Sequence, residues 1–180
     1  MTIFRPKTIR GVTYALDHLD PFRFEIDNGA GQLRGVSVLF ACHCFTEKLM
    51  GHHTPDLIYA HGHEKRAFDV GRHALSRLLP GLITTLGTNR VYRSTNPKQN
   101  HNYFFWRQNP APGFIGPYLV FFNVVAAKRT GVDVLMNVES AYMKPNMQDR
   151  GSPVRFSTLI DKTAKGQSVP FGPLVTIKRK

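Results

Sequence analysis

The chain has 180 residues and a mass of 20.3 kDa, so we expect a single hydrophobic core and no second catalytic domain. Apolar residues make up 42% and charged residues 20% of the chain, which excludes a mostly disordered protein and a miniprotein held together by disulfides. No apolar run approaches the ~20 residues that a membrane span needs, and the N-terminus lacks the hydrophobic stretch of a signal peptide. A cytoplasmic protein without a membrane partner is therefore expected.

The net charge of +12 comes from 24 Lys and Arg residues against 12 Asp and Glu residues. Half of the excess lies in residues 144–180, which contain eight basic and two acidic side chains. This distribution favours a polyanionic partner. The alternative is a basic solvated surface that serves solubility alone.

The predicted elements follow in chain order. Residues 1–34 mix prolines and glycines with short apolar pieces, which indicates an irregular N-terminal segment. The next segments are expected to be a buried strand (35–45), a histidine-rich loop (50–64), a helix (65–79) with a short second helix after Pro80, two strands (within 89–108) and an antiparallel hairpin (118–125 and 132–142).

This order predicts an α+β fold, with an antiparallel sheet of about four strands and one or two packed helices. We expect one globular domain over residues 1–143. Residues 144–180 are expected to form a basic C-terminal extension rich in proline and glycine, with short strands at 154–156 or 174–177 as alternatives to an irregular tail.

The two cysteines, Cys42 and Cys44, lie in the predicted first strand, where their spacing makes a mutual disulfide awkward. Together with nearby histidines they raise the question of zinc, but paired cysteines of structural zinc sites usually stand two to four residues apart. On a strand, both cysteines would point to one face and His43 to the other. The segment Gly62-His63-Glu64-Lys65 also lacks the second histidine of a zinc-hydrolase motif. No metal and no cofactor are therefore predicted.

Cleavage of RNA without a metal needs a group that deprotonates the 2′-OH, a proton donor for the leaving oxygen and cations for the phosphorane. Histidine suits proton transfer near neutral pH. Candidates for this chemistry gather in the first strand, around the helix start and late in the hairpin; they are His43, His63, Lys65, Arg66, Arg72, His73, Ser140 and Tyr142. Candidates for stacking bases or holding phosphates on the sheet are Tyr103, Trp106, Lys128 and Arg129.

Three stretches carry a resemblance to known proteins: residues 40–46 (FACHCFT), residues 66–80 (RAFDVGRHALSRLLP), and residues 118–124 (YLVFFNV) with 138–142 (VESAY). They resemble small bacterial and mobile-element proteins described as stationary-phase growth adaptation proteins. The closing hairpin also resembles the ribonucleases of the barnase, EndoU, colicin and RelE group, whose members often place Ser or Thr two residues before an aromatic residue.

The resemblance implies a fold like that ribonuclease group and a metal-independent endoribonuclease toxin, which forms a 2′,3′-cyclic phosphate and a 5′-OH. It implies that His43 transfers protons, that Arg66 or Arg72 clamps the scissile phosphate, and that Ser140 and Tyr142 position the substrate or donate a proton. An acidic antitoxin or inhibitor protein is the implied partner. Glu139 is either a general base or an outward strand residue.

A second hypothesis is a non-catalytic module of a mobile element that binds nucleic acid or an acidic protein through its charge. Such a module would lose affinity as salt rises and would leave RNA intact.

Overall fold

The longest strands of the computed structural model, β10 (Pro117–Arg129) and β11 (Val132–Met143), pair antiparallel, which confirms the predicted hairpin. The structure describes residues 3–94, 103–129, 131–145 and 152–172, and it describes only the backbone of Lys128 and Arg129. The two strands expected between 89 and 108 are also present, as β8 (Arg90–Arg93) and β9 (Tyr103–Gln108).

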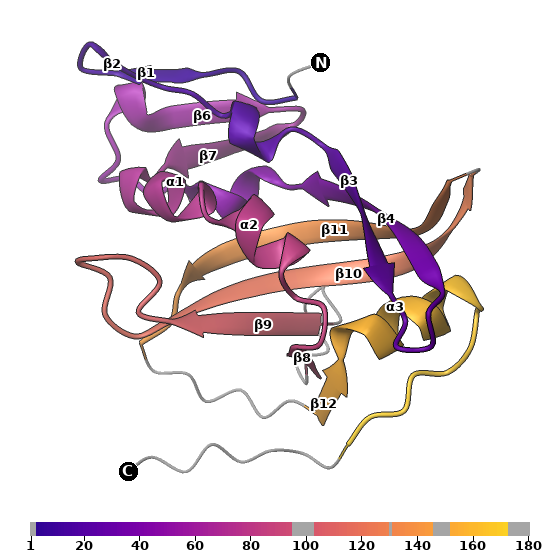
Figure 1. Ribbon diagram of the computed structural model, residues 1–180. Coiled ribbons are helices and arrows are strands. Elements are labelled where there is room, and N and C mark those ends of the chain that lie inside the picture. The colour runs from indigo at the N-terminus through magenta and orange to yellow at the C-terminus, as the bar shows by residue number, and fades with distance from the viewer. Residues whose placement is uncertain (1–2, 95–102, 130, 146–151, 173–180) are drawn as a thin grey trace.

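These strands belong to a sheet that contains seven strands in the described part of the chain, in the order β12-β8-β9-β10-β11-β4-β3 (Figure 1). β4 (Leu33–Phe40) corresponds to the strand expected over 35–45, although it ends at Phe40, and the added strands are β3 (Phe22–Asp27) and β12 (Ser152–Arg155). Every pair is antiparallel except β11 with β4, which run parallel. The α+β class is therefore confirmed, while the expected number of about four strands is wrong.

The extra strand β3 comes from a segment for which we expected irregular structure, and β12 comes from one for which a short strand was an alternative. β3 lies within residues 1–34 and β12 lies beyond residue 143, and each forms one edge of the large sheet. Edge strands tolerate proline and pair on one side only, so Pro21 and Pro153 do not prevent strand formation here. The strand expected at 154–156 corresponds to β12, and the alternative at 174–177 lies outside the described residues.

Two small sheets lie beside one end of the large sheet (Figure 1). One is the hairpin of β1 (Lys7–Ile9) with β2 (Val12–Tyr14). The other has the order β5-β7-β6, with bounds Thr46–Glu47, Glu64–Phe68 and Ile58–His61. Three short 3₁₀ helices, η1, η2 and η3, span Asp17–Leu19, Cys42–Cys44 and Pro55–Leu57. The segment 50–64 is thus not a simple loop.

The helix expected over residues 65–79 begins later than predicted, because Glu64–Phe68 pairs with β6 as strand β7. Helix α1 spans Val70–Ser76, and the carboxylate of Asp69 caps it by accepting a hydrogen bond from the Arg72 amide at 2.9 Å. Helix α2 follows as Leu79–Thr84, with Pro80 in its first turn, where a missing amide proton costs nothing.

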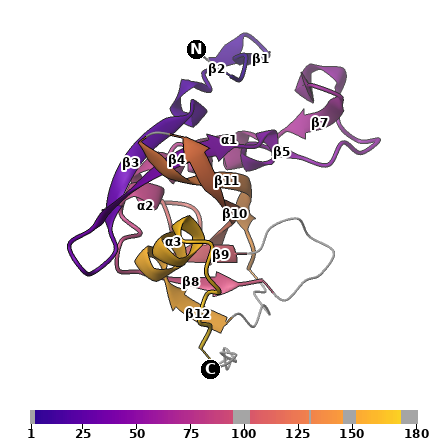
Figure 2. The same ribbon diagram turned by 90° about the vertical axis from the view of Figure 1, so that its right-hand side faces the viewer.

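The α-helices of the described residues, α1, α2 and α3, pack on one face of the large sheet (Figure 2). Leu75 of α1, Ile83 of α2 and Leu159 of α3 (Phe156–Ala164) join one core cluster with Val120 and Phe122 of β10. The opposite face carries a smaller cluster made of Phe104, Leu119 and Phe121. Burial of β10 on both faces explains its uninterrupted apolar run. No helix in the described ranges is long and apolar enough to cross a membrane.

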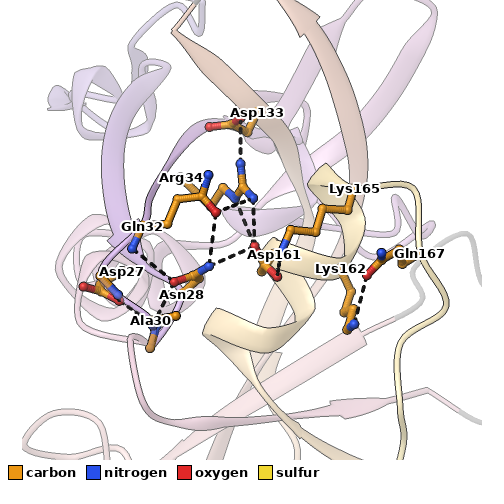
Figure 3. Close-up of polar contacts among 12 residues, drawn as sticks. Asp27, Asn28, Ala30, Gln32, Arg34, Asp133, Asp161, Lys162, Lys165 and Gln167 are labelled. Carbon is orange, nitrogen blue, oxygen red and sulfur yellow. Dashed lines mark hydrogen bonds and ion pairs between the residues drawn. The ribbon is translucent and has the colours of Figure 1, made fainter.

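Helix α3 is fastened to the hairpin of β3 and β4 by a polar network around Asp161 (Figure 3). Arg34 donates from Nε and Nη2 to Oδ1 of Asp161 at 3.1 and 3.0 Å, and Asn28 donates to the same oxygen at 3.1 Å. Lys165 donates to the other carboxylate oxygen at 2.7 Å. The segment expected to be a basic C-terminal extension therefore contributes a docked helix through residue 164.

Candidate functional site

The candidate site begins where β4 leaves β11. The amide of Ala41 donates to the carbonyl of Val138 at 2.9 Å, and the chain then turns through η2, the 3₁₀ helix Cys42–Cys44. The Thr46 hydroxyl closes this turn by donating to the Cys42 carbonyl at 2.7 Å. The expectation that both cysteines point to one face of a strand is therefore wrong, because residues 42–44 are not in a strand.

His43 contacts Glu64 across this turn. Its Nε2 lies 2.9 Å from a Glu64 carboxylate oxygen, and the Cys42 thiol donates to the same oxygen at 3.7 Å. The hydrogen bond from His43 holds the pKa of Glu64 below its ordinary value. The carboxylate is therefore an acceptor, so Nε2 carries the proton of the neutral ring and Nδ1 carries a lone pair.

The environment leaves this lone pair accessible. The side chains of His43 and Glu64 are 36% and 56% exposed, and His43 Nδ1 has no hydrogen-bond partner among the described residues. A histidine with one nitrogen held by a carboxylate and the other open to solvent is arranged to accept a proton from a substrate.

A second histidine–glutamate pair lies nearby in sequence, but there the second ring nitrogen of the histidine has a partner. His53 Nε2 lies 2.9 Å from a Glu47 oxygen, while its Nδ1 accepts a hydrogen bond from the Met50 amide at 2.9 Å. The His53 side chain is only 7% exposed. Both of its ring nitrogens are used inside the protein, so this pair is structural.

The two arginines predicted to clamp phosphate have different roles in the structure. Arg72 Nη1 donates to the carbonyls of Thr46 and His43 at 2.8 and 3.4 Å, so its guanidinium braces the turn. Arg66 donates from Nε to the Thr46 hydroxyl at 2.8 Å, and its two terminal nitrogens have no partner among the described residues. Arg66 is therefore the arginine that can receive a phosphate.

Tyr142 lies next to Arg72 and continues into an aromatic row. The Arg72 guanidinium carbon stands 5.1 Å from the centre of the Tyr142 ring. In register, Leu119 of β10 pairs with Tyr142 on one side and Trp106 on the other, and the Trp106 ring lies 4.5 Å from Tyr92. We name Tyr92, Trp106 and Tyr142 the aromatic row; all three are half-buried.

The other residues predicted for the site lie on different elements of the structure. His63 and Lys65 are exposed, in the turn before β7 and on β7 itself. His73 is buried, and its Nε2 donates a hydrogen bond to the Ala15 carbonyl at 2.8 Å, which is a structural role. Tyr103 lies on the face of β9 opposite Trp106, with its ring 5.8 Å from Phe122. The side chains of Lys128 and Arg129 lie outside the described residues.

Ser140 and Glu139 stand at a bulge in β11. Phe121 pairs with Ser140 while Phe122 pairs with Val138, which leaves Glu139 as the extra residue. Its carboxylate accepts a hydrogen bond from Asn123 at 2.9 Å. Glu139 itself is half-buried.

Sequence reasoning named Cys42 and Glu64 only in order to set zinc aside. In the structure, the sulfur of Cys42, a ring nitrogen of His43 and a carboxylate oxygen of Glu64 all lie within 4.8 Å of one another. Burial raises the pKa of the Cys42 thiol to about 11, so the thiol is protonated in the metal-free site. Gly62 is the residue in the sequence that could have indicated this contact. It has a φ of 58° and lies in the turn between β6 and β7, which leads the chain to Glu64.

The fold and the site together define an α+β protein with an exposed histidine–glutamate pair at the end of a large mixed sheet. A model of the YjaZ family matches residues 6–164, so the chain belongs to the YjaZ family. This match includes both β3 and α3. No curated protein and no solved structure matches the chain. The resemblance to stationary-phase growth adaptation proteins and to the ribonuclease group stays a prediction.

Proposed function

We propose that this protein is a metal-independent endoribonuclease in which His43, held by Glu64, is the proton acceptor. The observation that carries the proposal is the geometry of the ring. Nε2 is fixed at 2.9 Å from the carboxylate, while Nδ1 has no partner among the described residues and the side chain is 36% exposed. The buried pair of His53 and Glu47 lacks this open nitrogen.

The proposed reaction uses the 2′-OH of RNA as its nucleophile. His43 Nδ1 takes the proton of the 2′-OH, O2′ bonds to phosphorus, and the bond from phosphorus to O5′ breaks. The products are a 2′,3′-cyclic phosphate and a 5′-OH, whose oxygen takes a proton from water. Arg66 stabilises the charge that develops on the phosphorane, since its terminal nitrogens are not used within the described structure.

The aromatic row supports RNA as the substrate class. It crosses β8, β9 and β11, and Arg72 joins its Tyr142 end to the turn that carries His43. Half-exposed aromatic rings stack single-stranded bases with little sequence preference, and a protein with net charge +12 attracts the phosphates. Tyr103, on the opposite face, does not belong to this path. The toxin role and its acidic neutralising partner remain part of the proposal.

The test is incubation of the purified protein with total bacterial RNA in the presence of a chelator, followed by analysis of the fragment ends. We expect fragments with cyclic phosphate ends. His43→Asn and Glu64→Gln should each slow cleavage, the former by about 100-fold or more. Glu47→Gln alters the structural pair and is the matched control, so it should cleave like the parent.

Two outcomes would overturn the proposal. One is cleavage by His43→Asn at the parental rate, which would mean that another group or a contaminant cuts the RNA. The other is intact RNA that the protein merely retains in a salt-sensitive manner, which would favour the non-catalytic binding module.

A further inference from the structure

We propose that Cys42, His43 and Glu64 bind one zinc ion, and that zinc in this position switches off the ribonuclease. The second half of the inference rests on the proposed function; the first half does not. The three residues are the one group of potential metal ligands of this kind in the described part of the chain.

Two of the three distances between ligand atoms are close to those of a tetrahedral zinc site, and the third, between Cys42 and His43, is within 4.8 Å. With ordinary bond lengths to sulfur, nitrogen and oxygen, the ligand atoms stand ~3.4–3.6 Å apart. The Cys42 sulfur is already 3.7 Å from a Glu64 oxygen. The His43 nitrogen is 2.9 Å from the same oxygen and must open by about 0.5 Å. The exposed Glu64 side chain can make this shift by a small rotation.

The ligand chemistry selects zinc over magnesium or calcium. A thiolate and an imidazole are ligands of borderline-soft ions, whereas magnesium and calcium require oxygen ligands. Three protein ligands leave a fourth position open to water, as in zinc sites that are not purely structural. Arg66 interacts electrostatically with both Cys42 and Glu64, so its positive charge weakens binding and makes it reversible.

Zinc and catalysis compete for the same imidazole. In the metal-free site, Nε2 carries a proton and Nδ1 carries a lone pair. When zinc binds Nε2 of the neutral ring, the ring proton moves to Nδ1, and the Cys42 thiol releases its proton to solvent. Nδ1 then has no lone pair with which to accept the 2′-OH proton, although the RNA-binding surface is unchanged.

The chain provides matched controls for each ligand. The pair of His53 and Glu47 has the same 2.9 Å contact but no third ligand. Cys44 is fully buried, donates to the Val138 carbonyl at 3.7 Å and does not belong to the group of three ligands. Changes at these positions should leave metal binding intact.

The first experiment measures binding without RNA. The reduced protein is titrated with Co²⁺, whose thiolate bond absorbs in the near ultraviolet, and Zn²⁺ is then added to displace it. We expect one ion per chain, loss of the thiolate band in Cys42→Ala, and affinity reduced by more than about tenfold in Glu64→Gln. Glu47→Gln and Cys44→Ala should bind like the parent. Because Glu64 is exposed, its variant keeps the test valid if Cys42→Ala fails to fold.

A thiolate band that survives in Cys42→Ala, or equal affinity in Glu64→Gln and the parent, would overturn the zinc site. The second experiment measures RNA cleavage by the parent with and without one equivalent of Zn²⁺. Unchanged cleavage by zinc-loaded protein would overturn the switch. Zinc binding by a protein that never cleaves RNA would instead overturn the proposed function and leave the zinc site standing.

Discussion

At the scale of single residues, the surroundings of the second ring nitrogen distinguish His43 from His53. Both histidines contact a glutamate at 2.9 Å. The Met50 amide donates a hydrogen bond to the second ring nitrogen of His53. The second ring nitrogen of His43 has no such partner among the described residues, and its side chain is 36% exposed. Sequence reasoning selected His43 by resemblance, but it could not find Glu64 as its partner. The contact depends on the turn of η2 and on the pairing of β7 with β6, which no local pattern specifies.

Tyr118 illustrates the cost of an unpaired polar group. Its ring is fully buried, and its hydroxyl has no hydrogen-bond partner within the described structure. Burial raises the pKa of this hydroxyl well above its ordinary value. We expect Tyr118→Phe to increase the free energy of unfolding by about 1 kcal/mol, because it removes a hydroxyl that loses its hydration on folding and forms no hydrogen bond in return. Urea denaturation measures the change.

The matched control is Tyr59→Phe. The Tyr59 hydroxyl donates to the Arg5 carbonyl at 3.0 Å, so its removal should lower the free energy of unfolding by about 1 kcal/mol. If Tyr118→Phe destabilised the protein as much as this control, the Tyr118 hydroxyl would have a partner in solution.

His18 makes stability depend on pH. Burial lowers the pKa of His18 to about 4, and the nearby His73 and Arg77 act in the same direction against Asp17 and Asp20. The unfolded state, with an ordinary histidine pKa of about 6.5, therefore binds more protons between these two values. The free energy of unfolding should fall as pH is lowered from about 6.5 to about 4.

Denaturation at several pH values in this range, for the parent and for His18→Gln, tests the assignment. The variant should lose part of the pH dependence, because it removes the group that is neutral in the fold and protonated in the unfolded chain. A pH profile identical to that of the parent would show that other groups are responsible.

At the scale of elements, helix α3 depends on one carboxylate. Asp161 accepts hydrogen bonds from Lys165, Asn28 and Arg34, and the side chains of Asp161 and Arg34 are each 13% exposed. These contacts, led by that of Lys165, lower the pKa of Asp161 to about 2. The stabilisation is present above the ordinary pKa near 4 and is lost as pH falls toward 2.

Asp161→Asn should lower the free energy of unfolding by about 2–3 kcal/mol at pH 7, because among the described residues it leaves the largely buried Arg34 with Asp133, at 3.6 Å, as its one ionic partner. Thermal or urea denaturation measures this loss. The exposed pair of Asp56 with Arg10 is the control, and Asp56→Asn should change stability by no more than about 0.5 kcal/mol. Equal effects of the two variants would contradict the stabilising role of the Asp161 network.

At the scale of the whole molecule, strong local patterns were predictable and long-range pairing was not. The hairpin of β10 with β11 was confirmed because both arms are long, apolar and joined by a short turn. β3 was missed and β12 was expected only as an alternative, because both are edge strands that depend on distant partners, β4 and β8. Likewise, His43, Arg72 and Tyr142 come together only through the three-dimensional fold.

The parallel pairing of β4 with β11 has a consequence for biosynthesis. Val36 lies beside Val134, so the hairpin of β3 and β4 leaves the ribosome about 100 residues before the strand that it must join. At translation rates of about 5–20 residues per second, that hairpin waits for roughly 5–20 s with one apolar edge unpaired. The N-terminal half of the nascent chain is consequently the part that needs protection from aggregation, and folding of the whole protein is timed by the arrival of its second half.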